Sequence, residues 1–406
     1  MRLKKLTIFN YKNISEAELE FSPKINCFVG NNGEGKTNLL DAVYYLSFCK
    51  SHSNSIDTQN IKHDADFFVL QGFYERNGSP EEIYCGLKRR AKKQFKHNKK
   101  EYERLADHVG FLPLVLVSPA DAELISQGSD ERRKFIDGAI SQYDKIYLSR
   151  LIIYNQALAQ RNALLKSAQK NDSDLLELLE MQMQDAGEYI FQKRTDFIRD
   201  FLPTFQQFYD FISLGKEKIS FIYESQLQKG DFAAQMKNAR ERDRILGFST
   251  VGIHKDELVM LLDDFLIRRV GSQGQNKTFL TALKLAQFDF LKQQNGITPI
   301  LLLDDIFDKL DSERVQQIIH LVSDNRSSTG SPQRFGQIFI TDTNRKHLEK
   351  ILEEVKQEYR IFEISNGQLL PPSPPEGEDL PSLKNYKPVQ AKSGVSTSLS
   401  EGLGGA

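Results

Sequence analysis

The chain has 406 residues, of which 39% are hydrophobic and 27% charged, and its formal net charge is −1. These values are typical of a globular protein with two or three domain-sized lobes, and no apolar run reaches the ~18 residues that a membrane helix needs. A near-neutral chain has no general attraction to nucleic acid, so a nucleic-acid site must come from a local group of basic residues.

The N-terminus and the cysteines indicate the compartment. Residues 1–5 lead into alternating, strand-like residues and do not resemble a signal peptide. The three cysteines, Cys27, Cys49 and Cys85, have no spacing that suits a metal. We therefore expect a protein of the reducing cytoplasm with no membrane partner.

Strand and helix patterns follow one another along the chain. The first part predicts strands over residues 2–9, 17–29, 66–75, 82–90 and 115–117. A helical pattern then runs from about 120 to 245, with Gly187, Pro203 and Gly215 as its main breaks. Strand character returns at 250–270, where Asp263-Asp264 suits a hairpin turn. The last predicted elements are a helix over 273–294, a strand over 299–303, a helix over 311–323, a strand over 337–341 and a helix near 345–357.

This order predicts an α/β fold with a helical insertion. Residues 1–118 and 248–370 form one discontinuous lobe with a mixed or parallel sheet, and residues 119–247 form a helical lobe too short for a long coiled coil. Residues 371–406 are rich in Pro, Gly and Ser, and their composition predicts a disordered tail.

The segment Gly30–Thr37 has the pattern G-x-x-x-x-G-K-T between a predicted strand and a predicted helix. Glycines let backbone N–H groups surround a β-phosphate, Lys36 supplies a positive charge, and Thr37 offers a hydroxyl to Mg²⁺. A glycine-rich turn without a ligand is the alternative, but it does not account for the strand before the loop and the helix after it. The residues assigned to ATP are Gly30, Asn31, Asn32, Gly33, Glu34, Gly35, Lys36, Thr37 and Asn38.

Two carboxylates end the apolar run of residues 300–303. A buried parallel strand brings its carboxyl end to the edge where α/β sheets bind ligands. We expect Asp304 to hold Mg²⁺ with Thr37 and Asp305 to orient or deprotonate the attacking water. Many strands end in acids by chance, so this pattern indicates a site only in combination with the phosphate loop.

A second anion site is indicated at the start of the helix predicted over 273–294. Ser272, Gly274 and Gln275 lie there, and Ser272 is 32 residues before Asp304. A serine and a glycine at a helix N-terminus suit a phosphate, and a nucleotide already held by the first loop leaves this site for the nucleotide of a partner. The alternative is an ordinary helix capped by Ser272.

These three motifs together resemble those of the ATP-binding-cassette ATPases, and more specifically the RecF family, over roughly residues 1–370. The resemblance also rests on "NYKN" at 10–13, "SPADAELISQGSDERRKFID" at 118–137, "VGIHKDEL" at 251–258 and "LLLDDIFDKLD" at 301–311.

The resemblance implies that two copies sandwich two ATP molecules, with Ser272 of one copy on the γ-phosphate held by Lys36 of the other. Residues 308–311 would join the two sites across the dimer. It further implies slow, DNA-dependent ATP hydrolysis. The closed dimer would clamp duplex DNA near single-strand gaps, without sequence specificity, and direct RecA loading with RecR and RecO.

The sequence departs from the family pattern at several positions. Lys12 stands where the family usually has an arginine, which weakens a phosphate contact because lysine binds as a point charge. Ile253 and Lys255 replace a usual proline and arginine. Thr341 and Asp342 stand where cassette ATPases often place a histidine, which fits slow hydrolysis or hydrolysis that depends on Asp305.

Residues 88–100 hold eight basic residues and no acid, which suits non-specific contact with DNA phosphates. Phe95 lies among them and suits stacking on an exposed base. The alternative is a solvated hairpin whose charges face water. The basic side chains are Lys88, Arg89, Arg90, Lys92, Lys93, Lys96, Lys99 and Lys100. Weaker candidates are Arg132, Arg133, Lys134, Arg240, Arg242 and Arg244.

Two other functions compete with a DNA clamp. A chromosome-organising ATPase head of the structural-maintenance type needs coiled-coil arms of hundreds of residues, and the insertion here has about 125. An ATPase subunit of a membrane transporter lacks a long helical insertion and normally carries the histidine that is absent here.

Overall fold

The structure is a computed structural model that describes residues 1–167, 173–215, 217–306, 335–346, 348–349, 352 and 358–370. The predicted helix over 311–323, the loop over 308–311, most of the helix near 345–357 and the tail from 371 lie outside these residues.

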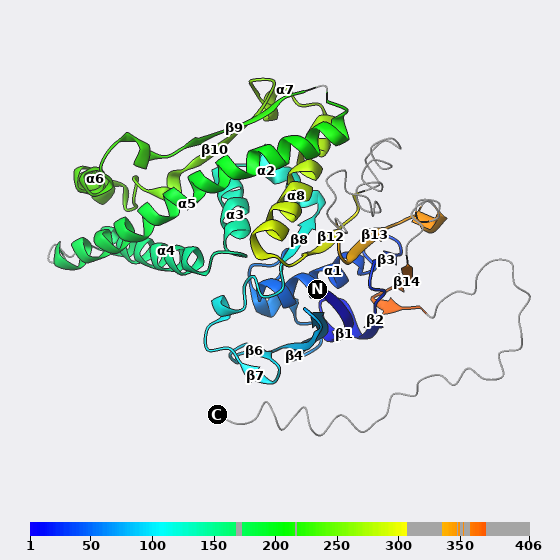
Figure 1. Cartoon of the computed structure of the whole chain (residues 1–406). Coiled ribbons are helices and arrows are strands. Elements are labelled where there is room, and N and C mark those ends of the chain that lie inside the picture. Colours follow the sequence, from blue (N-terminus) through cyan, green and yellow to red (C-terminus); the bar gives the residue numbers. More distant parts are fainter. Residues whose placement is uncertain are drawn as a thin grey trace, which may run out of the picture. The chain divides into compact units, whose positions relative to one another are not determined.

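An antiparallel sheet forms one layer of the molecule (Figure 1). Its strand order is β2-β1-β4-β5-β6-β7, so the first strands of the chain lie beside the basic hairpin. The strands are β1 (Arg2–Tyr11), β2 (Ile14–Glu20), β4 (Phe67–Arg76), β5 (Ser79–Lys88), β6 (Gln94–His97) and β7 (Lys100–Glu101).

A second sheet carries the phosphate loop and the acidic strand. Its order is β15-β14-β3-β13-β12-β8, and the strands from β14 to β8 are parallel. The strands are β3 (Ile25–Val29), β8 (Leu114–Val117), β12 (Ile300–Leu303), β13 (Ile338–Asp342), β14 (Tyr359–Ser365) and β15 (Gln368–Leu369). The parallel α/β sheet predicted from the sequence is therefore confirmed.

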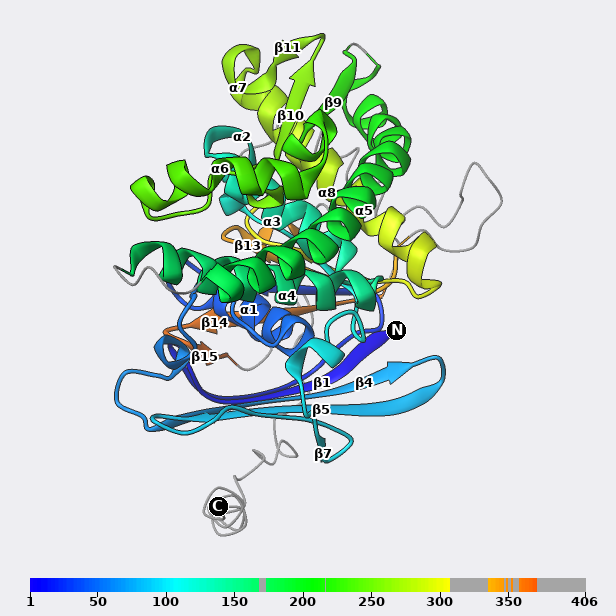
Figure 2. The ribbon, with the colours of Figure 1, turned by 90° about the vertical axis from the view of Figure 1, so that its left-hand side faces the viewer.

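Both faces of the parallel sheet are covered, which explains why β8 and β12 are continuous apolar runs. Ile300 and Leu302 join the core that includes helix α1 (Lys36–Phe48) and the antiparallel sheet. Leu301 and Leu303 join the core that includes helix α8 (Gln273–Asn295). Helix α1 thus lies between the two sheets and contacts strands of both (Figure 2).

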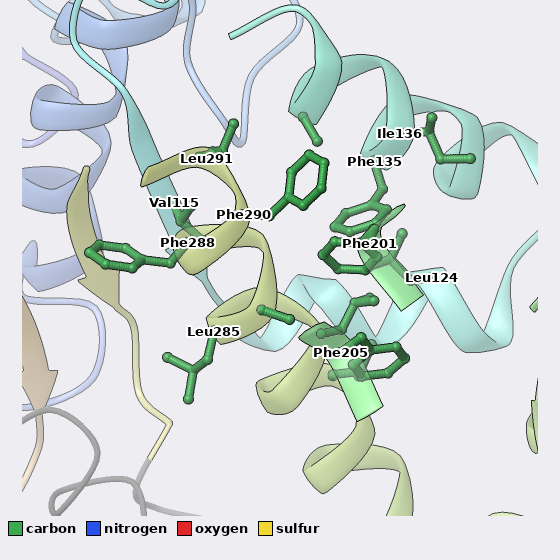
Figure 3. Close-up of a cluster of buried hydrophobic side chains, with 14 of the residues drawn as sticks. Val115, Leu124, Phe135, Ile136, Phe201, Phe205, Leu285, Phe288, Phe290 and Leu291 are labelled. Atoms are coloured by element: carbon green, nitrogen blue, oxygen red, sulfur yellow. The ribbon is translucent and has the colours of Figure 1, made fainter. Parts of the chain in front are cut away.

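The helical part packs against α8 through aromatic side chains. Phe201 and Phe205 of helix α5 (Ser173–Ser213) lie beside Phe290 of α8 and Phe135 of helix α3 (Figure 3). Aromatic rings bury large apolar areas, so these contacts join the helical part firmly to helix α8. The other helices here are α2 (Glu123–Ser126), α3 (Ser129–Ile140), α4 (Lys145–Lys166), α6 (Phe232–Leu246) and α7 (Ile267–Val270).

Several predicted details of this region are confirmed and others are wrong. Asp263 and Asp264 turn a hairpin between β10 (Glu257–Leu262) and β11 (Phe265–Leu266), both with positive φ as such turns require. Strand β9 (Ile219–Glu224), however, lies inside the segment predicted to be helical throughout, and it pairs with β10. The alternation of apolar Ile219, Phe221 and Tyr223 was the signal for it.

Two of the three predicted breaks do not interrupt the helix. Helix α5 continues through Gly187 and Pro203. Gly187 provides room for neighbours, because a Cβ there would lie 2.9 Å from the Phe232 ring. Pro203 removes one backbone donor, and the buried aromatic side chains on either side of it hold the helix together.

The described residues 1–370 form one compact unit, and the boundaries of the two predicted lobes stay a prediction. None of the helices in the described part of the chain combines the length and the apolar character that crossing a membrane requires.

A buried arginine on α5 ties the helical part together. Arg194 is 2% exposed and donates to both carboxylate oxygens of Asp137 at 3.0 Å. Its Nη1 also donates to Asp256 Oδ2 and to the Ile253 carbonyl, each at 2.9 Å. One guanidinium group on α5 therefore joins two other segments, α3 and residues 253–256, through hydrogen bonds.

We expect Arg194→Met to lower the free energy of unfolding by about 3–5 kcal/mol, because it leaves the buried carboxylate of Asp256 and the partly buried carboxylate of Asp137 without their guanidinium partner. The matched control is Arg199→Met on the same helix, where the arginine is exposed and pairs with Asp196 and Asp200. The control should change stability by no more than about 0.5 kcal/mol. Urea denaturation of both variants measures the difference, and equal losses would contradict this role of Arg194.

Candidate nucleotide-binding site

The phosphate loop begins where β3 ends and closes at the first residue of α1. Gly33 and Gly35 have φ of 84° and 115°, which only glycine adopts readily. Gly30 is restricted by space, since a Cβ there would lie 2.4 Å from the Ile364 carbonyl oxygen of β14. The glycines of the motif are therefore required by the backbone path, as a phosphate cradle predicts.

The lysine of the loop is held inside it. Lys36 Nζ donates to the carbonyl oxygens of Gly30 and Asn31 at 2.7 and 3.0 Å, and the residue is 4% exposed. The carboxylate of Glu34 accepts a hydrogen bond from the backbone N–H of Asn31 at 2.9 Å. This N–H is one of the donors that a phosphate cradle offers, so the Glu34 carboxylate accepts a hydrogen bond that a bound phosphate could accept.

A hydrogen-bonded cluster joins the loop to the acidic strand. Thr37 Oγ1 donates to Asp304 Oδ1 at 3.0 Å, and Thr341 Oγ1 donates to the same oxygen at 2.8 Å. The backbone N–H of Asp305 donates to Thr341 Oγ1 at 2.9 Å. Lys36, Thr37, Asp304 and Asp305, which sequence analysis assigned to one site, thus meet at the carboxyl ends of β3, β12 and β13.

The environment of Asp304 suits a cation. Burial raises the pKa of Asp304 above its usual value, although hydrogen bonds from Thr341 and Thr37 and the charge of Lys36 act in the opposite direction. Its carboxylate and the Thr37 hydroxyl are hard oxygen donors of the kind that Mg²⁺ prefers, and Mg²⁺ commonly takes only one or two protein ligands. Within the described ranges, no cluster of three or more His, Cys, Asp and Glu side chains suits a metal. The donor set therefore fits Mg²⁺ held partly by the phosphates of a nucleotide.

Sequence analysis missed the contacts of two residues in this cluster, Thr341 and Asp305. Thr341 was noted only as a replacement for a histidine, yet its buried hydroxyl bridges Asp304 and Asp305. Asp305 has φ of 46°, a strained value for this residue type, and its backbone N–H is held by Thr341. The pairing of β12 with β13 creates this contact, so the order of the strands was the missing information.

The second predicted anion site has the geometry of a capped helix. Ser272 is the N-cap of α8, and it exchanges hydrogen bonds with Gln275 in a capping box. The Gln275 side chain also donates to Glu217. Ser272 is exposed, and Gly274 lies in the first turn of the helix. The helix is capped by Ser272, which both interpretations allow, and the contact with a partner's nucleotide stays a prediction.

Lys12 points toward α1. Its Nζ lies 2.5 Å from Asp41 Oδ2 and 2.7 Å from Ser53 Oγ. The same carboxylate accepts hydrogen bonds from the Tyr11 hydroxyl, the Ser51 hydroxyl and the backbone of His52. A phosphate contact by Lys12 stays a prediction, and it would compete with the ion pair to Asp41.

The basic segment forms the end of β5, the strands β6 and β7, and the turns between them. Six of the eight basic residues are exposed: Lys88, Arg89, Arg90, Lys92, Lys99 and Lys100. Lys96 is half-buried. Lys93 instead turns inward and donates to the Cys49 carbonyl and to Asp57. Phe95 is 1% exposed and belongs to the core, so the prediction that it stacks on a base is wrong.

The weaker basic candidates are mostly engaged within the protein. Arg132 forms a bidentate ion pair with Glu257, and Arg240 pairs with Glu180. Arg133 and Lys134 pair with acids one turn away on the same helix. Arg242 and Arg244 are exposed on α6. Residues 88–100 therefore present the more accessible basic surface.

A phosphate loop and an acidic strand that meet at the carboxyl edge of a parallel sheet define a phosphate-loop nucleotide-binding domain. Comparison with known proteins specifies its family. The family model for the RecF/RecN/SMC N-terminal domain matches residues 2–368. The DNA replication and repair protein RecF of Phocaeicola vulgatus is 62% identical over 371 residues, which cover 91% of this chain and 98% of that protein.

Solved structures agree with this match. A structure of the recombination mediator protein RecF-ATP in the RecFOR pathway has a TM-score of 0.78 and 28% identity, covering 90% of this chain and 96% of the other. An SMC head bound to the C-terminal winged-helix domain of ScpA has a TM-score of 0.53 at 13% identity, covers 91% of this chain and 96% of the other, and shows the fold alone. The chain therefore belongs to the RecF/RecN/SMC family, and within it to the RecF proteins.

We expect Thr341→Val to lower the rate of Mg²⁺-dependent ATP hydrolysis about ten- to a hundredfold, since the buried valine keeps the shape but removes the hydroxyl that joins the Asp304 carboxylate to the backbone N–H of Asp305. Thr341→Ser, which keeps the hydroxyl, is the control and should stay near the wild-type rate. Phosphate release measured with excess ATP tests this. Equal rates for the valine and serine variants would contradict the role of the hydroxyl.

Proposed function

We propose that this protein is an ATP-dependent DNA-binding protein of recombinational repair and replication. Two ATP molecules would close a dimer on duplex DNA near a single-strand gap, and slow hydrolysis would open it. The observation that carries this proposal is the hydrogen-bonded cluster of Thr37, Asp304, Thr341 and Asp305 beside Lys36, in a chain of the RecF family.

The residues of the cluster have distinct parts in this proposal. The backbone N–H groups of the loop and the ammonium of Lys36 bind the β- and γ-phosphates. Thr37 and Asp304 hold Mg²⁺, which when bound neutralises charge on the phosphate oxygens. Asp305 orients the attacking water or accepts its proton. Thr341 holds the backbone at Asp305 and offers no base of its own, which is consistent with weak hydrolysis.

The position of Ser272 supports the proposed dimer. An exposed serine at the N-terminus of the 23-residue helix α8 suits a γ-phosphate that a second copy presents. If the closed dimer binds DNA and ATP favours the closed dimer, then ATP raises the affinity for DNA. By linkage, DNA raises the affinity for ATP by the same factor. The same coupling would make hydrolysis DNA-dependent.

The exposed basic surface of residues 88–100 is the proposed contact with DNA. Lysine and arginine that neutralise phosphates release counterions, and this contribution is independent of sequence. In this proposal the protein acts in the cytoplasm and recognises a duplex beside a single-stranded region. There it directs the loading of RecA together with RecR and RecO. Helices α4 and α5, with 22 and 41 residues, are far shorter than the arms of chromosome-organising ATPases.

We expect ATP and Mg²⁺ to strengthen binding of the wild-type protein to a fluorescent gapped duplex, as measured by anisotropy. Asp305→Asn should keep the DNA bound for longer after excess unlabelled DNA is added, because the closed state persists. Lys36→Met should bind DNA equally with and without ATP. The same DNA affinity with and without ATP for the wild-type protein would refute the clamp.

The double variant Lys92→Glu/Lys100→Glu should weaken DNA binding at least tenfold and reduce the slope of log K against log salt concentration by about 1.8, from ~0.9 per phosphate contact. The control, Lys229→Glu/Lys237→Glu, changes the net charge equally at exposed positions of the helical part. If both double variants lose affinity to the same extent, net charge and not this surface determines DNA binding.

A further inference from the structure

The outer side of the phosphate loop is held by two turns that lie far apart in the sequence. One is the turn between β1 and β2, which contains Asn13, and the other is the turn of Asn366 and Gly367 between β14 and β15. Neither turn belongs to the phosphate-loop motif.

Both turns donate to the same backbone carbonyl. Asn13 Nδ2 donates to the Glu34 carbonyl oxygen at 3.2 Å, and the backbone N–H of Gly367 donates to it at 2.8 Å. Asn38 Nδ2, from the first turn of α1, donates to Asn13 Oδ1 at 2.8 Å and so fixes the Asn13 amide. The oxygen of Glu34 therefore has two donors, one from each end of the described chain.

This arrangement determines the direction of a phosphate-binding group. A trans peptide is planar, and its carbonyl and N–H point to opposite sides. Two donors that hold the Glu34 oxygen toward the turns consequently hold the N–H of Gly35 toward the hollow of the loop. Hydrogen bonds to the carbonyl also polarise the peptide and make that N–H a better donor to an anion.

The contacts leave no space for adjustment. A Cβ at Gly35 would lie 2.9 Å from both end atoms of the Asn13 amide. A Cβ at Gly367 would lie 2.5 Å from the Asn13 carbonyl oxygen. The loop, the first turn and the last turn are therefore in direct contact at glycine positions.

We propose that Asn13 and Gly367 are positioning residues of the nucleotide site, which orient the Glu34–Gly35 peptide for the phosphates of ATP. The β14–β15 hairpin is thereby part of the ATP site, although it lies more than 300 residues from the loop. This inference rests on the proposed binding of ATP.

The chain offers a matched control for the hairpin. Asn77 and Gly78 form the turn between β4 and β5, with φ of 51° and 80°, and Asn366 and Gly367 have φ of 51° and 72°. A Cβ at Gly78 would meet nothing within 4 Å. Gly78→Ala and Gly367→Ala therefore carry the same backbone strain, but only the second change pushes a turn away from the phosphate loop.

The experiment measures the Kd for a fluorescent ATP analogue and the melting temperature of the nucleotide-free protein, for the wild type, Lys36→Met, Asn13→Ala, Gly367→Ala and Gly78→Ala. We expect Asn13→Ala and Gly367→Ala each to raise Kd about three- to tenfold, the factor for one lost hydrogen bond. Gly78→Ala, which shares the backbone strain but meets no neighbour, should lower the melting temperature by no more than Gly367→Ala does and leave Kd unchanged. The double variant Asn13→Ala/Gly367→Ala should raise Kd by less than the product of the two single increases, because both changes act on one carbonyl.

Two results would overturn these ideas in different ways. If the wild type binds ATP, Lys36→Met does not, and the Kd of Gly367→Ala and Asn13→Ala equals that of Gly78→Ala, the two turns are merely structural and the inference is wrong. If the wild type itself does not bind ATP, the proposed function is refuted, and the inference with it.

Discussion

The candidate site depends on one buried oxygen, Asp304 Oδ1, which accepts hydrogen bonds from Thr37 and Thr341. Thr37 and Asp304 are 267 positions apart, and only a parallel sheet with the order β3-β13-β12 brings them together. Burial makes the charged carboxylate costly unless donors or a cation compensate it. The fold therefore creates a position where negative charge is held ready for a cation, beside a loop whose N–H groups suit phosphates.

Helices α1 and α8 connect this position to the rest of the molecule. Helix α1 begins at Lys36, and the carbonyl of Cys49 at its other end accepts a hydrogen bond from Lys93 of the basic hairpin. Helix α8 begins at Ser272 and packs on the aromatic side chains of α5. Helix α1 thus connects the phosphate loop to the proposed DNA surface, and helix α8 connects the proposed Ser272 contact to the helical part.

The residues that meet at the candidate site were largely predictable from the sequence, because the phosphate loop is a run of consecutive residues and an apolar strand ending in two acids has few interpretations. The contacts that depend on strand order were not. Thr341 contacts Asp304 and Asp305 because β13 pairs with β12, and Phe95 faces inward because the pairing of β6 with β5 sets its direction. Lys93, which precedes β6, turns inward to Cys49 and Asp57. A run of charges reveals none of these contacts. The β14–β15 hairpin had a usable signal, since Asn366-Gly367 is a typical two-residue turn.

The central claim is that two copies complete the ATP site. Light scattering of the protein with and without ATP and Mg²⁺, repeated with a short gapped duplex, tests it most directly. The account predicts that ATP doubles the mass and that the duplex stabilises the larger species. A protein that keeps the mass of one chain at saturating ATP, with and without DNA, would contradict the account.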